Sequence, residues 1–265
     1  MPPGGMLGSE VTMLLYSERV EIILQQIQLK SVVRIVDLTE QLQVSIDTVR
    51  RDLKSMERNG LIKCVRGGAC LPDSLSALSD FSGSEITHID LKREAARKAV
   101  RYIEPNLVIA MNSGTTNTIL AQELAFRNDK ITVVTNNLAA ANILMQNSFI
   151  RLIVVGGMVD VLEKSTYGTV CEKEFSRYYP DIAFLSMEAV NDREGFTDFR
   201  LRETGIIEIL ADRSGKTLAV MDSSKLGKRS QKKVLSLDRV DRMLTDDSVS
   251  IKLKKEYEQK GLLIE

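Results

Sequence analysis

The sequence predicts an α/β protein that carries a small α+β head. Within the first 70 residues, short helical patterns lead into a strand that ends in Gly-Gly, and a stretch rich in Ser, Asp, Pro and Gly follows. After that stretch, short continuous apolar runs alternate with helical patterns, which is typical of a mostly parallel sheet covered by helices. At 265 residues and 43% hydrophobic composition, the chain is long enough for two globular domains.

The first two helices of the head are predicted from apolar spacing. Residues 17–30 place apolar side chains three and four positions apart, which is one face of a helix. A short β-leaning run at 32–35 follows, and residues 36–43 then predict a second, shorter helix.

The third helix has a start signal and a stop signal. Ser45 can cap its first turn, and Asn59-Gly60 can end it. Residues 61–66 then predict a strand that ends at Gly67-Gly68. Helix, strand, helix, tight turn, helix and hairpin is the order of a winged helix-turn-helix.

The outward face of this third helix is basic. If Val49, Leu53 and Met56 face the core, short polar residues and then four cations point outward. Such a face suits the major groove of DNA, where Arg forks onto guanine edges and Ser or Thr meets phosphate or base. The predicted DNA-binding residues, including two of the hairpin, are Ser45, Asp47, Thr48, Arg50, Arg51, Lys54, Arg58, Lys63 and Arg66.

An isolated helix of this composition has a second interpretation. It can be a solvated surface with internal ion pairs, such as Asp47 with Arg51. The context favours DNA binding, because the helix follows a short helix across a tight turn and precedes a strand. Between Ser45 and Gly68, six cations face three anions, whereas the whole chain has 36 of each.

A long ordered motif runs through the head. From Asp37 to Ile62 the chain reads D-L-x-x-x-L-x-V-S-x-x-T-V-R-R-D-L-x-x-x-E-x-x-G-x-I, and R-G-G-A follows at 66–69. With this motif the head resembles the amino-terminal domain of DeoR-family transcriptional regulators, although the family usually has Glu in place of Asp37. The resemblance implies that Ser45, Thr48, Arg50 and Arg51 contact DNA and that the wing at 63–68 touches the DNA backbone.

Six continuous apolar runs predict the strands of the larger part. They lie at 107–111, 131–135, 151–155, 182–187, 217–221 and 242–245. Small or polar residues follow five of them, and ligands bind outside the carboxyl ends of the strands in open parallel sheets. NSGTTNTIL opens a helix whose N–H groups can hold a phosphate, although S-G-T-T alone can also be a structural turn. Because the chain has neither a P-loop nor G-x-G-x-x-G, a nucleotide is not indicated.

The order of short motifs in this part is informative. SGTT, VTNN, VVGG, STYG, DIAFLS, GFT and DSSKLG follow one another as in the effector domain of the DeoR family, which is related in fold to ribose-5-phosphate isomerase. This resemblance implies a phosphorylated sugar or related metabolite as effector. The expected effector-binding residues are Asn112, Ser113, Gly114, Thr115, Thr116, Asn136, Gly157, Gly168, Glu188 and Lys225, with Lys92 as an extra cation.

Two positions depart from the family pattern. The family often has Asp in place of Asn112, and a Gly-rich turn with Asp in place of SMEAVND at 186–192. Replacing Asp by Asn removes an anion that could bind sugar hydroxyls. The choice of ligand is therefore expected to depend on these two positions.

The alternative to a regulator is a sugar-phosphate isomerase-like enzyme with an accessory helix-turn-helix domain. Isomerisation needs a general base and a stabiliser of the enediolate. Glu188 and Lys225 can be imagined in these roles, but the acidic turn of the enzyme is not recognisable. His88, the only histidine, is expected at the surface near the linker. We therefore expect no enzyme activity, no catalytic residue, no cofactor and no metal site.

The remaining features of the sequence concern the cellular location and the division of the chain into segments. Three cysteines without C-x-x-C or zinc-finger spacing, no signal peptide and no apolar run of membrane length predict a cytoplasmic protein. The expected segments are a loose tail (1–16), the winged helix-turn-helix domain (17–70), a linker (71–88) and an effector-binding and oligomerisation domain (89–265). We expect a DNA-binding regulator, a repressor of a carbohydrate-metabolism operon. Its expected partners are an operator duplex, a small effector and further copies of itself.

Overall fold

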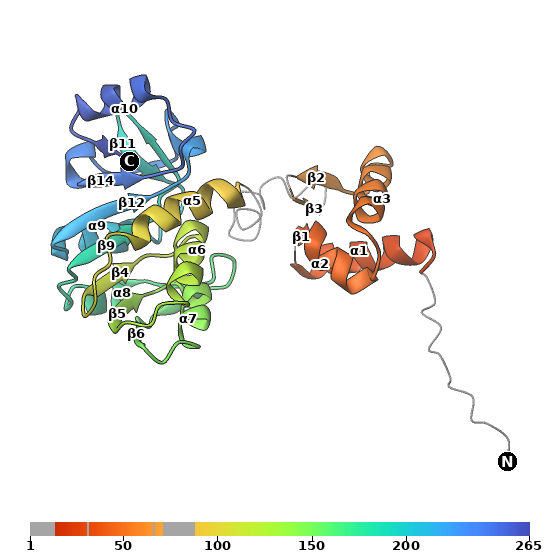
Figure 1. Cartoon of the computed structure of the whole chain (residues 1–265), viewed down its shortest axis with the longest axis horizontal. Coiled ribbons are helices and arrows are strands. Elements are labelled where there is room, and N and C mark those ends of the chain that lie inside the picture. The colour runs from red at the N-terminus through yellow and green to blue at the C-terminus, as the bar shows by residue number, and fades with distance from the viewer. Residues whose placement is uncertain (1–13, 31, 66, 71–87) are drawn as a thin grey trace, which may run out of the picture. The chain divides into compact units, whose positions relative to one another are not determined.

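The computed structural model describes residues 14–30, 32–65, 67–70 and 88–265 (Figure 1). It divides the chain into two compact units, Met1–Thr87 and His88–Glu265. Arg66, one of the predicted DNA-binding residues, lies outside the described residues, as do the expected linker up to residue 87 and most of the expected tail.

The first unit is a winged helix-turn-helix. Its three helices and three short antiparallel strands, in the sheet order β1-β3-β2, follow the predicted sequence of elements. The helices are α1 (Tyr16–Lys30), α2 (Ile35–Leu42) and α3 (Ile46–Arg58), and the strands are β1 (Val32–Arg34), β2 (Lys63–Val65) and β3 (Gly68–Cys70). All three helices contribute to one core, which includes Ile23, Leu38, Val49, Leu53 and Met56.

The ends of α2 and α3 explain the tight turn between them. Gln43 ends α2 in the left-handed region, with φ of 50°. Ser45 then caps α3 as predicted, because its Oγ accepts the N–H of Thr48 at 3.2 Å. At the other end Asn59 is the C-cap, and Gly60 follows with φ of 71°, a conformation that glycine adopts without a steric penalty.

The second unit is built on a seven-stranded parallel sheet in the order β15-β14-β12-β9-β4-β5-β6. All six predicted strands are confirmed, with ends that differ by one or two residues. The seventh, β15, has two residues and was not predicted from the sequence. The strands are β4 (Val108–Met111), β5 (Ile131–Thr135), β6 (Ile150–Val154), β9 (Ile182–Leu185), β12 (Lys216–Val220), β14 (Arg242–Leu244) and β15 (Leu263–Ile264).

Helices cover both faces of this sheet (Figure 1). Alternate strand residues serve the two layers: Ile109 and Met111 pack with one set of helices, and Ala110 packs with the other. The first set is α5 (Ile89–Val100), α6 (Thr115–Leu124) and α7 (Leu138–Leu144), and the second is α8 (Thr169–Phe175), α9 (Thr204–Arg213) and α10 (Ile251–Glu258). The continuous apolar runs are thus explained by burial on both faces.

Two smaller sheets were not predicted from the sequence. One is a hairpin of β7 (Met158–Asp160) and β8 (Ser165–Tyr167). The other is an antiparallel sheet of β10 (Ala189–Asn191), β11 (Gly195–Asp198) and β13 (Lys232–Leu235). Their strands have three or four residues, too few for a period of two to stand out.

The strand order places a topological switch point between β4 and β9. From β4 the chain proceeds to β5 and β6 on one side, and from β9 it proceeds to β12, β14 and β15 on the other. The two loops that leave these central strands therefore diverge, and a crevice forms outside their carboxyl ends in sheets of this kind. The five predicted strand ends all lie along this edge, because all these strands are parallel.

Two further findings concern the described residues only. No helix among them is long and apolar enough to cross a membrane, and no group of three or more His, Cys, Asp or Glu side chains among them is placed to hold a metal ion.

His88, expected at the surface, is half-buried at the start of α5, with φ of 55°.

Candidate nucleic-acid interface and effector site

The basic face of α3 is exposed as predicted. Val49, Leu53 and Met56 are buried, and the outward cations Arg50, Arg51, Lys54 and Arg58 are exposed. Ser45 and Asp47 at the start of α3 and Lys63 in the wing are exposed too. Thr48 is half-buried, and its hydroxyl lies 2.9 Å from the Ser45 hydroxyl.

The ion pair expected between Asp47 and Arg51 within α3 is wrong, because Asp47 pairs with Arg50 instead. Asp47 lies 3.6 Å from Arg50, one turn away at i,i+3, and not beside Arg51. Both side chains of this pair are mostly exposed, so the pair holds Arg50 weakly. Within the described part of the chain, Arg51, Lys54 and Arg58 make no ion pair and remain available to an anionic partner.

One acidic residue of the basic helix points inward. The Asp52 carboxylate is buried and accepts two hydrogen bonds from Arg19 of α1, at 2.7 and 3.1 Å. This bidentate pair raises the pKa of Arg19 and fixes α3 against α1. A second link joins α3 to the wing, because the Cys64 N–H donates to the Glu57 carboxylate at 2.8 Å. These links set the direction in which the basic face points.

In the second unit, Asn112 joins the two strands of the switch point. It follows β4, and its carboxamide binds the backbone of Ser186 after β9, accepting the N–H at 2.8 Å and donating to the carbonyl at 3.0 Å. Asn112 is fully buried. Both polar atoms of its side chain therefore serve the sheet and do not face an open crevice.

Arg200 is the centre of the polar network at this edge. Its guanidinium forms a bidentate pair with Asp198, at 2.7 and 3.0 Å, and also donates to the Ser113 hydroxyl at 3.0 Å and the Ser186 carbonyl at 2.8 Å. Burial lowers the pKa of Arg200, but Asp198 more than offsets this and raises it. We call the side chains of Lys92, Asn136, Arg200 and Glu203 at this edge the cradle. The cradle thus contains a buried, charged cation, Arg200, that was not predicted from the sequence.

Asn136 and Glu203 each have an acceptor atom without a partner among the described residues. Asn136 donates to the Glu203 carboxylate at 2.9 Å, yet its own Oδ1 and the Oε2 of Glu203 are buried without a hydrogen bond. Burial raises the pKa of Glu203, and Arg200 acts against this shift. Buried polar atoms normally have partners, so these two atoms mark where hydrogen-bond donors are missing.

A third carboxylate, that of Glu163, interacts with Asp198, Arg200 and Glu203. Burial raises the pKa of Glu163, in the loop between β7 and β8, to about 7. Arg200 lowers it, whereas the nearby Asp160, Glu203 and Asp198 raise it further. Several carboxylates therefore share the field of one arginine.

The predicted S-G-T-T segment starts α6 as expected. Gly114 is its N-cap with φ of 124°, and a Cβ there would lie 2.7 Å from the Ser186 hydroxyl, so no other residue fits. Thr115 and Thr116 are buried in the first turn, and the Lys92 ammonium of α5 donates to the Thr115 hydroxyl at 3.0 Å. A second buried cation thus lies at this helix start.

The remaining predicted residues have identified contacts. Lys225 pairs with Glu188 at 2.8 Å, which joins the ends of β12 and β9. A Cβ at Gly157 would lie 2.6 Å from the Tyr167 carbonyl, so tight packing of the hairpin accounts for this glycine. Gly168, with φ of 97°, caps α8.

Sequence reasoning missed Asp198, Arg200, Glu203 and Glu163. The signal of Asp198, Arg200 and Glu203 was weak, because charged residues crowd T-D-F-R-L-R-E between a strand and a helix, where a solvated loop is the ordinary interpretation. Glu163 lies outside this segment, in the loop between β7 and β8.

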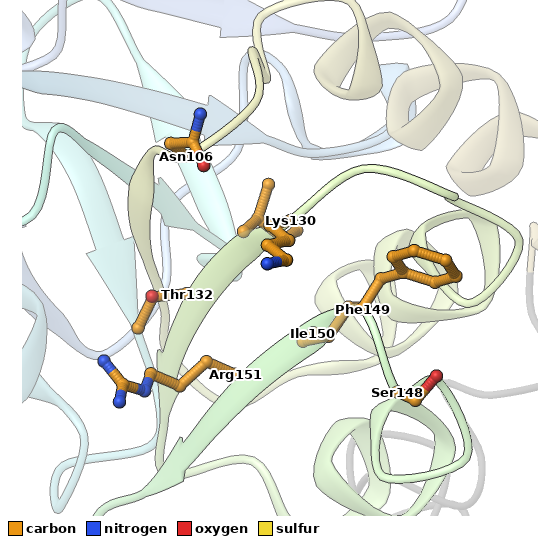
Figure 2. Close-up of a pocket in the computed structure, with 8 residues that line it drawn as sticks. Asn106, Lys130, Thr132, Ser148, Phe149, Ile150 and Arg151 are labelled. Carbon is orange, nitrogen blue, oxygen red and sulfur yellow. The ribbon is translucent and has the colours of Figure 1, made fainter.

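A hollow at the opposite edge of the sheet does not coincide with this network. It has a volume of about 340 Å³ and opens beside the amino ends of β5 and β6, where Lys130, Thr132, Phe149 and Arg151 line it (Figure 2). We place the candidate effector site at the carboxyl edge, because buried charges and unpartnered acceptors gather there.

Comparisons with known proteins identify both units. The family model described as the DeoR-like helix-turn-helix domain matches residues 19–75, and that of the DeoR C terminal sensor domain matches residues 87–247. The chain belongs to the DeoR family of transcriptional regulators. The chain is therefore a transcriptional regulator, as predicted.

Curated relatives of the family match most of the chain. The HTH-type transcriptional regulator GolR of Listeria innocua is 30% identical over 92% of this chain and 96% of its own length. The putative aga operon transcriptional repressor of Escherichia coli O157:H7 is 28% identical (88% and 87%), and the glycerol-3-phosphate regulon repressor of Escherichia coli K12 is 28% identical (79% and 82%).

Solved structures give a weaker likeness, over about half of the chain. Ribose 5-phosphate isomerase A from Methanocaldococcus jannaschii covers 53% of this chain and 55% of its own, at 20% identity and a TM-score of 0.40. We therefore assign the fold of the second unit from the order of its own strands.

Proposed function

We propose that this DeoR-family regulator represses a carbohydrate-metabolism operon, reading its operator with α3 and the wing and sensing a phosphorylated sugar or related metabolite at the carboxyl edge of the sheet. The observation that carries the DNA part is the exposed row of cations on α3, held over a buried apolar stripe. The observation that carries the effector part is the buried polar network at the switch point.

The chemistry of α3 supports DNA reading. Arg51 is exposed, makes no ion pair in the described part of the chain, and lies on the outward face of a helix that α1 holds through Asp52. An Arg of this kind forks onto the O6 and N7 of guanine, whereas Lys54 and Arg58 suit phosphates. The wing residue Lys63 and, by family resemblance, Arg66 are proposed to touch the DNA backbone.

The chemistry of the cradle supports an anionic, polyhydroxylated ligand. Lys92 and Arg200 supply positive charge beside the start of α6, whose dipole favours an anion such as phosphate. The unpartnered Oδ1 of Asn136 and Oε2 of Glu203 accept hydrogen bonds, which the hydroxyl groups of a sugar can donate. The name of one relative, the glycerol-3-phosphate regulon repressor, contains a phosphorylated polyol, which belongs to this class of metabolite.

We propose that the effector acts by differential affinity. A ligand shifts regulation only if it binds the DNA-competent and incompetent states unequally. We also propose a homo-oligomer, because a helix-turn-helix reader usually binds repeated half-sites as a dimer. The regulator is proposed to have no enzyme activity, in keeping with the regulators of its family.

The test of DNA reading compares two arginines. Arg51→Ala is expected to weaken binding to a duplex selected from random sequences by about 5- to 150-fold, the range for one guanine contact. Arg193→Ala removes an exposed arginine of the second unit and should leave affinity unchanged. Equal affinities of both variants and the wild type would overturn the assignment of α3.

The test of effector sensing is a thermal-shift screen against phosphorylated sugars, repeated with operator DNA. A binding sugar phosphate should raise the melting temperature and change operator affinity, and Thr115→Val combined with Lys225→Ala should lose both responses while binding DNA normally. Silence across the panel would overturn the proposed ligand class. Turnover of a pentose phosphate by the purified protein would favour the isomerase alternative.

A further inference from the structure

The first residue of α3 is an exposed isoleucine. Ile46 begins the helix and keeps 43% of its surface exposed, whereas the other apolar residues of α3 are buried. Among the described residues of α3, all the other exposed ones are charged. Single exposed apolar residues are ordinary on a protein surface, so the surroundings of Ile46 have to decide whether it has a role.

The packing of the head gives Ile46 no part in the core. Among the described residues, the core of the head and the apolar side chains that flank it include Val44 and Val49, which lie on either side of Ile46 in the chain, but not Ile46 itself. Its apolar surface therefore meets water in the free protein. A partner that covers this surface would gain the free energy of removing it from water.

The neighbours of Ile46 favour base edges over phosphates. The Ser45 hydroxyl accepts the Thr48 N–H at 3.2 Å and lies 2.9 Å from the Thr48 hydroxyl, so these two short polar side chains are bonded to each other. Asp47 is the first charged residue of the helix, and its side chain is 83% exposed. This carboxylate would repel a phosphate. The first turn of α3 is therefore better suited to the floor of the major groove than to the DNA backbone.

Ile46 also lies beside a proposed DNA contact. Residues four apart on a helix are neighbours on its surface, which places Ile46 next to the exposed Arg50. Residues at the amino end of a recognition helix contact base edges in the major groove. Ile46 is thus the first side chain of α3 that meets the bases when Arg50 enters the groove.

The major groove offers one apolar group to such a side chain. All four bases present hydrogen-bond donors or acceptors there, and thymine adds a C5 methyl group. Isoleucine has no donor or acceptor, so the thymine methyl is its complement among the base edges. Four residues of a helix span about 6 Å, and stacked bases lie about 3.4 Å apart, so Ile46 and Arg50 contact bases within about two base pairs of each other.

We infer that Ile46 is a specificity-determining residue that contacts the C5 methyl group of a thymine in each operator half-site, within about two base pairs of the base that Arg50 contacts. The inference rests on the proposed reading of DNA by α3. It names a base that the arginines and lysines of this helix leave open, because their donors do not recognise a methyl group.

The test removes single methyl groups from the DNA. A duplex selected from random sequences is remade with each thymine replaced in turn by deoxyuridine, which lacks only the C5 methyl. For the wild type, replacement at one position of a half-site should weaken binding about 4-fold, the factor for one buried methyl group. Ile46→Ser should bind the unmodified duplex more weakly than the wild type does. It should bind the duplex modified at that position as well as the unmodified one.

Two further variants separate the methyl contact from a change in the helix. Ile46→Val keeps two methyl groups and should stay sensitive to deoxyuridine at the same position. Val36→Ser removes a valine that is 59% exposed in the first turn of α2, and it should respond to deoxyuridine as the wild type does. Circular dichroism checks that all three variants are folded.

Either of two results would overturn the inference: a wild type that is indifferent to deoxyuridine at every position, or an Ile46→Ser variant with the wild-type response. The variant Arg51→Ala, measured on the same duplex, distinguishes this failure from that of the proposed function. If Arg51→Ala weakens binding in either case, α3 reads DNA without the methyl contact. If Arg51→Ala binds as the wild type does, the proposed reading by α3 is wrong, and the contact of Ile46 is wrong with it.

Discussion

Asn112 and Ser186 are joined by a two-point amide contact across the switch point of the sheet: Asn112 Oδ1 accepts the Ser186 N–H at 2.8 Å, and Nδ2 donates to the Ser186 carbonyl at 3.0 Å. An aspartate at this position can only accept when ionised, so it would place a carboxylate against the carbonyl oxygen. The sequence interpretation treated this asparagine as a lost ligand for sugar hydroxyls. In the structure its side chain is a buried link between β4 and β9.

Asn112→Asp is expected to lower the free energy of unfolding of the second unit by about 2 kcal/mol, because it removes one buried donor and leaves a carbonyl unsatisfied. Urea unfolding at neutral pH measures this change. Asn128→Asp, at an exposed position, is the control and should stay within about 0.5 kcal/mol of the wild type. Equal stability of the two variants would contradict the role of the link.

Asp52→Ala is expected to destabilise the head by about 2 kcal/mol, because it leaves the half-buried Arg19 guanidinium without its carboxylate partner. Hydrogen exchange of the amides in α1 and α3 reports this unit separately from the other one. Asp47→Ala removes an exposed carboxylate from the same helix and should leave the exchange rates nearly unchanged. Similar exchange in both variants would show that the Arg19 pair does not hold α3.

Operator affinity should fall steeply as the salt concentration rises. The variants Arg51→Ala, Lys54→Ala and Arg58→Ala test single contacts. Each variant that loses a phosphate contact should reduce the slope of log K against log salt concentration by about 1. The physical reason is the release of one counterion per neutralised phosphate. Fluorescence anisotropy between low and moderate salt measures the slope. A flat response of the wild type would favour a protein-binding role for the head.

Glu163 predicts a dependence of stability on pH. Its pKa is raised from 4.5 to about 7 in the folded protein, so the folded state holds a proton that the unfolded state has released. The stabilisation is therefore complete below about pH 4.5 and is lost as pH rises through about 7, with an upper size of about 3 kcal/mol.

Between about pH 5 and 8, Glu163→Gln should remove the part of the loss of stability that comes from Glu163. The difference in the free energy of unfolding between the variant and the wild type, from urea unfolding, measures this part. The comparison with the wild type matters because burial also raises the pKa of Glu203, which stays in both proteins. Glu258→Gln, at an exposed position of α10, should keep the wild-type profile. Parallel profiles for all three proteins would contradict the placement of Glu163.

The prediction of the fold succeeded where the signal was local. Val49, Leu53 and Met56 are buried as their spacing predicts, because a helical period of 3.6 residues places them on one face. The continuous runs from 107–111 to 242–245 form parallel strands, because helices bury both faces of the sheet. The prediction failed for β15 and for the β7–β8 hairpin, whose strands of two or three residues carry almost no periodic signal.

The sequence by itself determined the basic face of α3, the parallel strands and the polar residues at their carboxyl ends, since each depends on the order of neighbouring residues. Only the tertiary structure decided what those ends contact. Arg200 meets Ser113, 87 positions earlier in the chain, and Glu203 meets Asn136, 67 positions earlier. Such pairs depend on which strands lie side by side in the sheet, and this order is set by the packing of the whole unit and not by any local pattern.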